Sequence, residues 1–277
     1  MNNASSLIRN NLNIPTIPEV VQRVENLVND PDAGTGEIGA VVAEDAPLAA
    51  KVLRIANSAF YGLSNECVST EQATTVLGVQ VLKNIVMQVA VMSQFDHLEE
   101  SDLFSVEDFW RHSNDTAQLC QFMARRAGSQ LGLAPEELYV CGLLHDVGKV
   151  VMLDGLGRSY LELVEQSIRN KRPLHMLESA ELGFNHTDVG TLVASRWGLP
   201  EAVADAIRFH HGPRERVAES PVVALVAHAN LIMHRVREGN LAAATGVVDE
   251  ATCNLIGIRP EDVDACVAFA ESSGVSA

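Results

Sequence analysis

Apolar residues recur three to four positions apart along most of the chain, which is the spacing of helices with one buried face. No stretch shows the sustained alternation of a half-buried strand. In the first part of the chain the pattern predicts about five short helices. The first starts within residues 14–19 and stops at the turn sequence NDPDAG (residues 29–34), and a strongly apolar helix closes this part at Phe95.

The second part follows the short acidic segment DHLEESD (residues 96–102), which is the best candidate for a domain boundary. Beyond it the pattern predicts a long helix over residues 106–131 and a helix that carries His145. Further helices are expected at residues 160–169, 174–182, 186–196, 200–211 and 222–236, with two more in the tail. The pattern therefore predicts an all-α fold with two helical subdomains, residues 14–95 and 103–277.

The composition is that of a soluble globular protein, with 47% apolar and 20% charged residues. The 36 acidic and 20 basic residues give a net charge of -16, which disfavours binding to the phosphate backbone of nucleic acids. The five cysteines show no CxxC spacing, and no stretch reaches the ~18 consecutive apolar residues of a membrane span. Residues 1–6 lack a signal-peptide pattern. We therefore expect a cytoplasmic protein that binds neither membrane nor nucleic acid.

An adjacent histidine and aspartate, His145 and Asp146, interrupt an apolar run with helical spacing from Val140 to Val151. Burying an imidazole and a carboxylate side by side is costly unless a partner compensates. A divalent metal ion would bind both groups together. A hydrogen-bonded structural pair would also satisfy them, and the run by itself favours neither interpretation.

Two series of motifs resemble one protein family. The first comprises IPTIPEVV (residues 14–21), NDPD (29–32), DAPLAAKVLRIANSAFYG (45–62) and ATTVLGV (73–79). The second comprises FWRHS (109–113), GLLHDVGK (142–149), FNHTDVG (184–190), WGLP (197–200) and IRFHH (207–211). Together they resemble the HDOD domain, the HD-related output domain of bacterial signalling proteins, and more remotely the HD and HD-GYP phosphohydrolases. The resemblance implies an all-α fold in which an N-terminal HDOD subdomain packs on an HD-type helical subdomain.

The resemblance also implies a metal site. Six residues match positions that bind metal in HD-GYP-type enzymes: His112, His145, Asp146, His186, His210 and His211. Lys149 matches the basic residue of the same motif, where it would contact an anionic substrate. Asp108, four residues before His112, shares its helical face and is expected to bind metal or to orient the His112 ring. The expected cofactor is one or two divalent ions of iron, manganese or a similar metal.

Two departures from the catalytic relatives argue against hydrolysis. Asn230, in the stretch LVAHANL (residues 225–231), stands where those relatives have an aspartate, and a neutral amide cannot act as a base. The Gly-Tyr-Pro signature that follows the paired histidines in HD-GYP enzymes is absent. The histidines that match no motif are expected on the surface or in the core: His97, His175, His228 and His234.

Two functional hypotheses follow. Since members of the family are mostly described as regulatory modules without demonstrated catalysis, the first is a signal-transduction module that binds a signalling protein or a small ligand. Asn57 and Tyr61, four residues apart, would line its binding surface, although a helix cap and a buried aromatic explain them equally well. The second is a metal-dependent phosphohydrolase acting on a nucleotide or phosphoester, with catalytic roles for Asp146 and Lys149 and a metal-activated water. The sequence favours the regulatory hypothesis.

Overall fold

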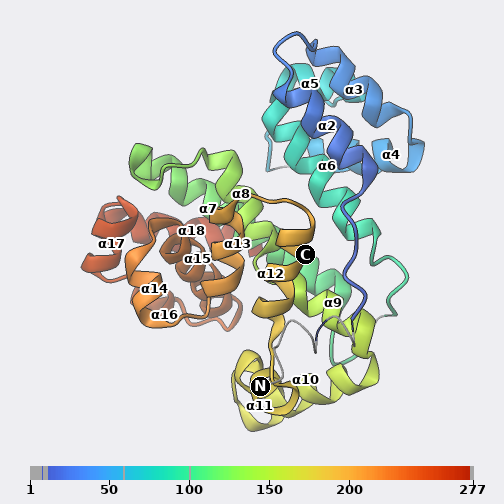
Figure 1. Cartoon of the computed structure of the whole chain (residues 1–277). Helices are drawn as coiled ribbons and strands as arrows, with labels where there is room; N and C mark the ends of the chain where they lie inside the picture. Colours follow the sequence, from blue (N-terminus) through green and yellow to red (C-terminus); the bar gives the residue numbers. More distant parts are fainter. Residues whose placement is uncertain (1–7, 9–11, 59, 100, 275–277) are drawn as a thin grey trace. The chain divides into compact units, whose positions relative to one another are not determined.

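The computed structural model describes residues 8, 12–58, 60–99 and 101–274, and these residues form an all-helical fold (Figure 1). No strand occurs in this part of the chain, where the single pairing of extended backbone is a bridge between Ser101 and Phe104. The predicted all-α class is therefore confirmed. None of the described helices combines the length and the apolar character needed to cross a membrane. Residues 1–6, which argued against a signal peptide, lie outside the described residues.

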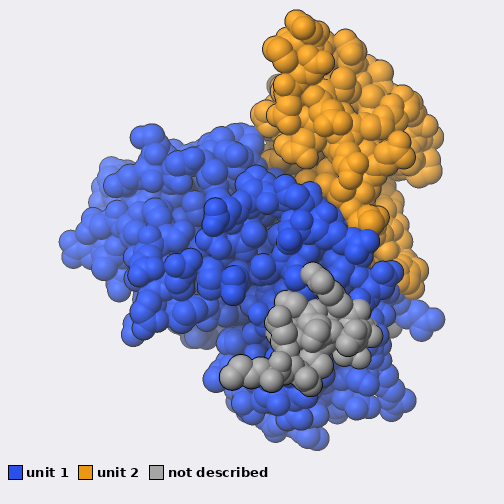
Figure 2. All heavy atoms as spheres, in the orientation of Figure 1, with its two compact units in different colours: residues 1–15, 98–277 blue, residues 16–97 orange. Residues whose placement is uncertain are grey.

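The chain divides into two compact units, residues 16–97 and residues 98–277 together with residues 1–15 (orange and blue in Figure 2). The division falls inside the acidic segment at residues 96–102. At the other end, Pro15 belongs to the larger unit, because its carbonyl oxygen accepts a hydrogen bond of 2.9 Å from the indole nitrogen of Trp197.

The smaller unit is built around one buried helix. It contains α2 (Glu19–Asn29), α3 (Thr35–Ala43), α4 (Ala46–Ala56), α5 (Thr70–Leu77) and α6 (Val79–Ser93). Every residue of α6 from position 84 to 91 is buried, and α2 and α4 both pack against this helix. Side-chain caps define the starts of two others, since Asp45 accepts from the backbone of α4 and Ser69 from that of α5.

The larger unit is a helical assembly that begins with α7 (Val106–Ala127) and a short 3-10 turn (Gly128–Leu131). It continues with α8 (Pro135–Leu144), α9 (Val147–Leu156), α10 (Arg158–Asn170), α11 (Leu174–Leu182), α12 (His186–Arg196), α13 (Glu201–Phe209), α14 (Arg214–Glu219), α15 (Pro221–Arg237), α16 (Leu241–Thr245), α17 (Glu250–Ile256) and α18 (Pro260–Gly274). α7 packs along α8, while α12 packs against both α9 and α13. The predicted long helix ends earlier than expected because Gly128 adopts a positive φ of 66°.

Glycines allow two of these helix pairs to approach closely. A Cβ atom at Gly142 of α8 would lie 2.6 Å from the Cα atom of Ala117 on α7. A Cβ atom at Gly148 of α9 would overlap the backbone carbonyl oxygen of His186, the first residue of α12. Any larger residue at position 148 therefore has to push apart the two helix starts that carry Asp146 and His186.

We expect Gly148→Ala to destabilise the larger unit by about 3 kcal/mol, because the added methyl group meets rigid backbone rather than a flexible side chain. Thermal or denaturant unfolding of the purified variant measures this loss. Gly246→Ala is the matched control, since a Cβ atom there meets its nearest neighbour, the Ala242 carbonyl oxygen, at an ordinary 3.5 Å. Equal stability of the two variants would contradict the close approach of α9 and α12.

Candidate metal centre

His145 and Asp146 lie at the junction of two helices. His145 is the C-cap of α8, and Asp146 is the N-cap of α9. The sequence-based expectation that the pair sits within one helix is therefore wrong. Both residues are fully buried, and the break in the helix turns the two side chains toward the starts and ends of neighbouring helices.

Three other elements bring the remaining predicted ligands to this junction. His112 projects from α7, His186 opens α12, and His210 and His211 follow the end of α13. Their potential ligand atoms form two groups, each with all atoms within 4.8 Å of one another, and Asp146 belongs to both. One group is Asp146, His186, His210 and His211, and the other is His112, His145 and Asp146.

The two carboxylate oxygens of Asp146 face different neighbours. Oδ1 lies 3.3 Å from Nε2 of His186 and 3.3 Å from Nε2 of His210. Oδ2 lies 3.3 Å from Nε2 of His145 and 2.5 Å from Nζ of Lys149. Asp146 therefore lies at the centre of the cluster, and Lys149 forms an ion pair with it.

Each of the three imidazoles around Asp146 has its Nδ1 atom engaged on the far side of the ring. Nδ1 of His145 lies 2.7 Å from the Gly142 carbonyl oxygen, and Nδ1 of His210 lies 2.8 Å from that of Ile207. Nδ1 of His186 lies 2.6 Å from Oε2 of Glu178. Because these oxygens can only accept, each Nδ1 carries the proton, and in a neutral ring each Nε2 presents a lone pair to the Asp146 carboxylate.

Lone pairs that face a carboxylate repel it, and a metal cation between them would remove this repulsion. Nε2 of His145, His186 and His210 and Oδ1 of Asp146 are all buried without a hydrogen-bond partner. Leaving such atoms unsatisfied is costly, and imidazole nitrogens together with a carboxylate oxygen are a typical donor set for a divalent transition metal. The residues present therefore fit a metal ion.

Burial keeps two of the rings neutral. It lowers the pKa of His210 to about 4, and burial together with the neighbouring His234 and His145 lowers the pKa of His112 well below its usual value. His186 behaves differently, because burial would lower its pKa but the charge of Glu178 raises it overall. Burial opposes ionisation of Asp146, yet Lys149 and His145 hold the pKa of this carboxyl well below its ordinary range.

Glu178 of α11 is a part of the site that the sequence analysis did not find. Its side chain is fully buried, and Oε2 accepts hydrogen bonds from both the backbone nitrogen (3.0 Å) and Nδ1 of His186. Its other oxygen accepts a bond of 2.7 Å from the hydroxyl of Tyr160. A carboxylate that holds the far nitrogen of a metal-binding histidine is a common support for such ligands.

Two histidines outside the motifs also belong to the site's surroundings. The ring of His234 packs on that of His112 with a centroid distance of 4.6 Å, and the ring of His175 stacks on His211 at 4.2 Å.

By contrast, Asp108 does not face His112, because it is exposed and pairs with Arg111. The predicted role of Asp108 at the metal site is therefore wrong.

Asn230 on α15 lies at the edge of the cluster. It is buried, and its Oδ1 atom is 3.0 Å from Nε2 of His112. A cavity of about 590 Å³ opens beside it, with His210, His211 and His234 in its walls. The remaining walls are largely apolar side chains from α14 to α17, such as Leu231 and Leu255. The cavity gives a small molecule access to the histidines that follow α13.

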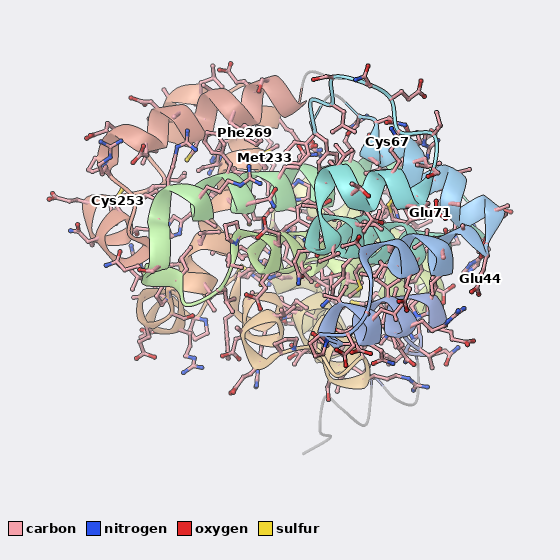
Figure 3. The ribbon with its side chains drawn as sticks, turned by 90° about the horizontal axis from the view of Figure 1, so that it is seen from above. Glu44, Cys67, Glu71, Met233, Cys253 and Phe269 are labelled. Atoms are coloured by element: carbon pink, nitrogen blue, oxygen red, sulfur yellow. The ribbon has the colours of Figure 1, made fainter. Side chains whose placement is uncertain are left out.

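Asn57 and Tyr61, the predicted binding surface of the smaller unit, are both half-buried. The Asn57 amide forms two hydrogen bonds with the backbone of Cys67, to its carbonyl oxygen (2.9 Å) and from its nitrogen (2.8 Å). Cys67, labelled in Figure 3, lies in the connection between α4 and α5. Asn57 lines a shallow pocket of about 530 Å³, but Tyr61 is not among its lining residues and packs edge-on against Phe60.

We expect Asn57→Ala to destabilise the smaller unit by about 2 kcal/mol, because it leaves the buried Cys67 backbone without two hydrogen bonds. Denaturant unfolding measures the change, and Asn65→Ala, at an exposed position in the same connection, is the control. An Asn57→Ala variant of unchanged stability that loses binding of a signalling partner would instead support the predicted binding surface.

An all-helical fold with a histidine and aspartate cluster at a helix junction is typical of HD-related proteins. Comparison of the sequence with known protein families identifies the family. The family model of the HDOD domain matches residues 14–213. Because this match covers well over half of the chain, the chain belongs to the HDOD domain family, as its motifs predicted.

Known proteins similar to this chain include one solved structure of the same family. The crystal structure of an HDOD domain protein with unknown function from Geobacter sulfurreducens has a TM-score of 0.80 and 26% identity, covering 98% of this chain and 93% of that chain. An uncharacterized protein from Treponema pallidum is 27% identical over 79% of this chain and 42% of its own length. Ribonuclease Y from Aquifex aeolicus is 33% identical over 44% of this chain and 16% of its own length. The chain thus spans less than half the length of these curated relatives.

Proposed function

We propose that this protein is a regulatory HDOD signalling module whose larger unit binds a divalent metal ion, iron, manganese or a similar metal. The observation that carries the proposal is the convergence of buried, unpartnered Nε2 lone pairs from His145, His186 and His210 on the Asp146 carboxylate. His211, which belongs to the same group of ligand atoms, completes the set. Such a donor set binds a cation far more favourably than it packs empty.

In this proposal the ligand that regulates the module is a small anion or phosphoester that reaches the centre through the adjoining cavity. His210 and His211 belong both to the metal group and to the cavity walls. A bound metal would supply positive charge to an anionic ligand. The chain's own groups orient the site, since the backbone carbonyls of Gly142 and Ile207 and the side chain of Glu178 fix the rings.

A second candidate function is metal-dependent hydrolysis of a phosphoester, and the cavity beside the histidines favours it. Ribonuclease Y, a relative named for cleaving RNA, matches less than half of this chain. The acidic net charge of -16 favours a small phosphoester over a polynucleotide. Asn230 argues against hydrolysis, because its neutral amide cannot accept a proton from water.

Metal analysis separates these functions. The protein is purified without oxygen, its metal content is measured by mass spectrometry, and the loaded protein is assayed on phosphomonoesters and phosphodiesters. Stoichiometric metal without turnover supports the regulatory module, and stoichiometric metal with turnover supports the phosphohydrolase. Protein that takes up no Fe²⁺ or Mn²⁺ when the metals are supplied contradicts both.

A further inference from the structure

The turn between α10 and α11 gathers unpaired positive charge on a strongly acidic protein. Arg169, Lys171 and Arg172 are all exposed, and none of them forms an ion pair with a described residue. At the other end of α10, by contrast, Arg158 pairs with Glu162. Because the chain has a net charge of -16, partners for surface cations are plentiful, and three unpaired cations in one turn are a local exception.

The same turn holds a lysine in a backbone conformation that favours glycine. Lys171, the C-cap of α10, has a φ of 50°, and it is the only residue other than glycine with a positive φ in the described part of the chain. Where α11 and α17 end in this left-handed conformation, the chain has Gly183 and Gly257. A side chain is less favourable there than glycine. Such strain is often retained where the side chain has a function, and the group that this turn retains is a cation.

Two exposed apolar side chains flank the turn. Ile168 follows the buried Val164 by four residues and so lies on the same face of α10, yet it is 64% exposed. Met176, near the start of α11, is 49% exposed. α10 and α11 lie together at one edge of the larger unit and pack mainly on each other and on α9 and α12 (Figure 1). The apolar face of α10 thus continues beyond the helices that cover it.

Hydrogen bonds fix the turn from both of its ends. The backbone nitrogen of Arg172 donates to the carbonyl oxygen of Ser167 (3.1 Å), and the Ser167 hydroxyl donates to the carbonyl oxygen of Arg172 (2.7 Å). A turn that is already ordered loses little backbone entropy when a partner binds it.

From these observations we propose that this basic turn (Ile168, Arg169, Lys171, Arg172 and Met176) is a docking surface for a partner protein, which binds it through a segment of acidic and apolar side chains. Positive charge beside exposed apolar groups is complementary to such a segment. A membrane or a polynucleotide fits less well, because its extended negative charge would also face the acidic remainder of the chain. The inference rests on the proposed regulatory function and assigns the surface by which the module binds its partner.

The basic turn is connected to the candidate metal centre by the two helices that form it. Tyr160 of α10 donates a hydrogen bond of 2.7 Å to Glu178 of α11, and Glu178 accepts one of 2.6 Å from Nδ1 of His186. A partner bound at the basic turn would therefore contact the same two helices that orient His186.

Binding of an acidic peptide tests the docking surface. The probe is a fluorescein-labelled helical peptide of glutamate and leucine, and fluorescence anisotropy measures its affinity for the purified full chain in low salt. Lys171→Glu should weaken binding by about tenfold, because an attraction becomes a repulsion. Arg158→Glu, the same charge reversal at an exposed position of the same helix, is the control and should bind like the wild type. Equal affinity of the two variants, or no binding to the wild type, would overturn the proposal.

Lys171→Gly separates docking from a structural role. Glycine adopts the left-handed conformation more readily than lysine, so the variant should melt at no lower temperature than the wild type. Loss of the cation should nevertheless weaken peptide binding by about threefold. A variant with a lower melting temperature and unchanged peptide binding would show that Lys171 serves the fold alone.

Three further probes identify the chemistry of the partner. A peptide of glutamate and serine should bind more weakly than the peptide with leucine, because it offers no apolar side chains to Ile168 and Met176. Phosphatidylglycerol vesicles and a single-stranded polynucleotide should not bind. Binding of either one that Lys171→Glu removes would overturn the assignment to a protein partner.

Metal uptake, measured on the same preparations, separates a failure of this inference from a failure of the proposed function. A wild-type chain that takes up Mn²⁺ but does not bind the acidic peptide overturns the docking surface and leaves the metal centre standing. A chain that binds the peptide through Lys171 but takes up no metal overturns the proposed centre instead.

Discussion

Replacing Asp146 by asparagine is expected to abolish the stabilisation of this protein by metal. A ligand present at a thousandfold excess over its dissociation constant stabilises the native state by about 4 kcal/mol. For a chain of this size that corresponds to a rise in melting temperature of roughly 10 °C. Asp146 contacts all three inward-facing imidazoles, and a neutral amide in its place is a much weaker ligand.

The measurement is a thermal melt of wild type and variant with added Mn²⁺ and with a chelator. The variant should melt at the same temperature in both conditions, whereas the wild type should melt higher with the metal. Asp154→Asn, an exposed position on the same helix α9, is the control and should keep the full shift. An Asp146→Asn variant that retains the shift would mean that the metal binds elsewhere.

The helical fold could be predicted because apolar residues recur three to four positions apart along most of the chain. The same regularity explains the error at His145 and Asp146. Apolar residues continue at helical spacing on both sides of the pair, since α8 and α9 are both buried, so the pattern does not register the break between them. The break lies beside a close tertiary contact, since a Cβ atom at Gly148 would overlap the start of α12.

The ligand histidines could be predicted because short motifs carry them, whereas their supports could not. Glu178 lies on α11 in no motif, and its contact with His186 depends on how α11 meets the start of α12. Asp108 shows the opposite case. Helical spacing places Asp108 near His112, but on the exposed side of α7 Asp108 pairs with the oppositely charged Arg111. Spacing alone does not predict which of the two residues Asp108 contacts.

Glu178→Gln is expected to weaken metal binding by about 10- to 100-fold, although Glu178 is not a proposed ligand. The buried carboxylate holds Nδ1 of His186 at 2.6 Å and thereby keeps the Nε2 lone pair directed at the centre. Glutamine has the same shape but no charge, and its amide can present a donor to the ring instead of an acceptor. Competition with a chelating dye measures the affinity, and Glu181→Gln, exposed on the same helix, is the control.

The pH dependence of the same measurement distinguishes positioning from a general loss of stability. In the metal-free wild type, Glu178 raises the pKa of His186, so below that pKa a metal ion has to displace a proton and its affinity should fall as the pH falls. Without the carboxylate this pKa drops, and the affinity of Glu178→Gln should be lower but less dependent on pH near neutrality.

The stability of the metal-free protein should also depend on the protonation of His186. It should fall as the pH rises, whereas the metal affinity falls as the pH falls. Because the pKa of His186 is raised in the folded state, its contribution is complete below the unfolded value of about 6.5 and is lost as the pH rises through the folded value. Glu178→Gln should lack this loss. A variant that binds metal ten times more weakly while keeping the wild-type pH dependence of both affinity and stability would show that Glu178 acts through packing alone.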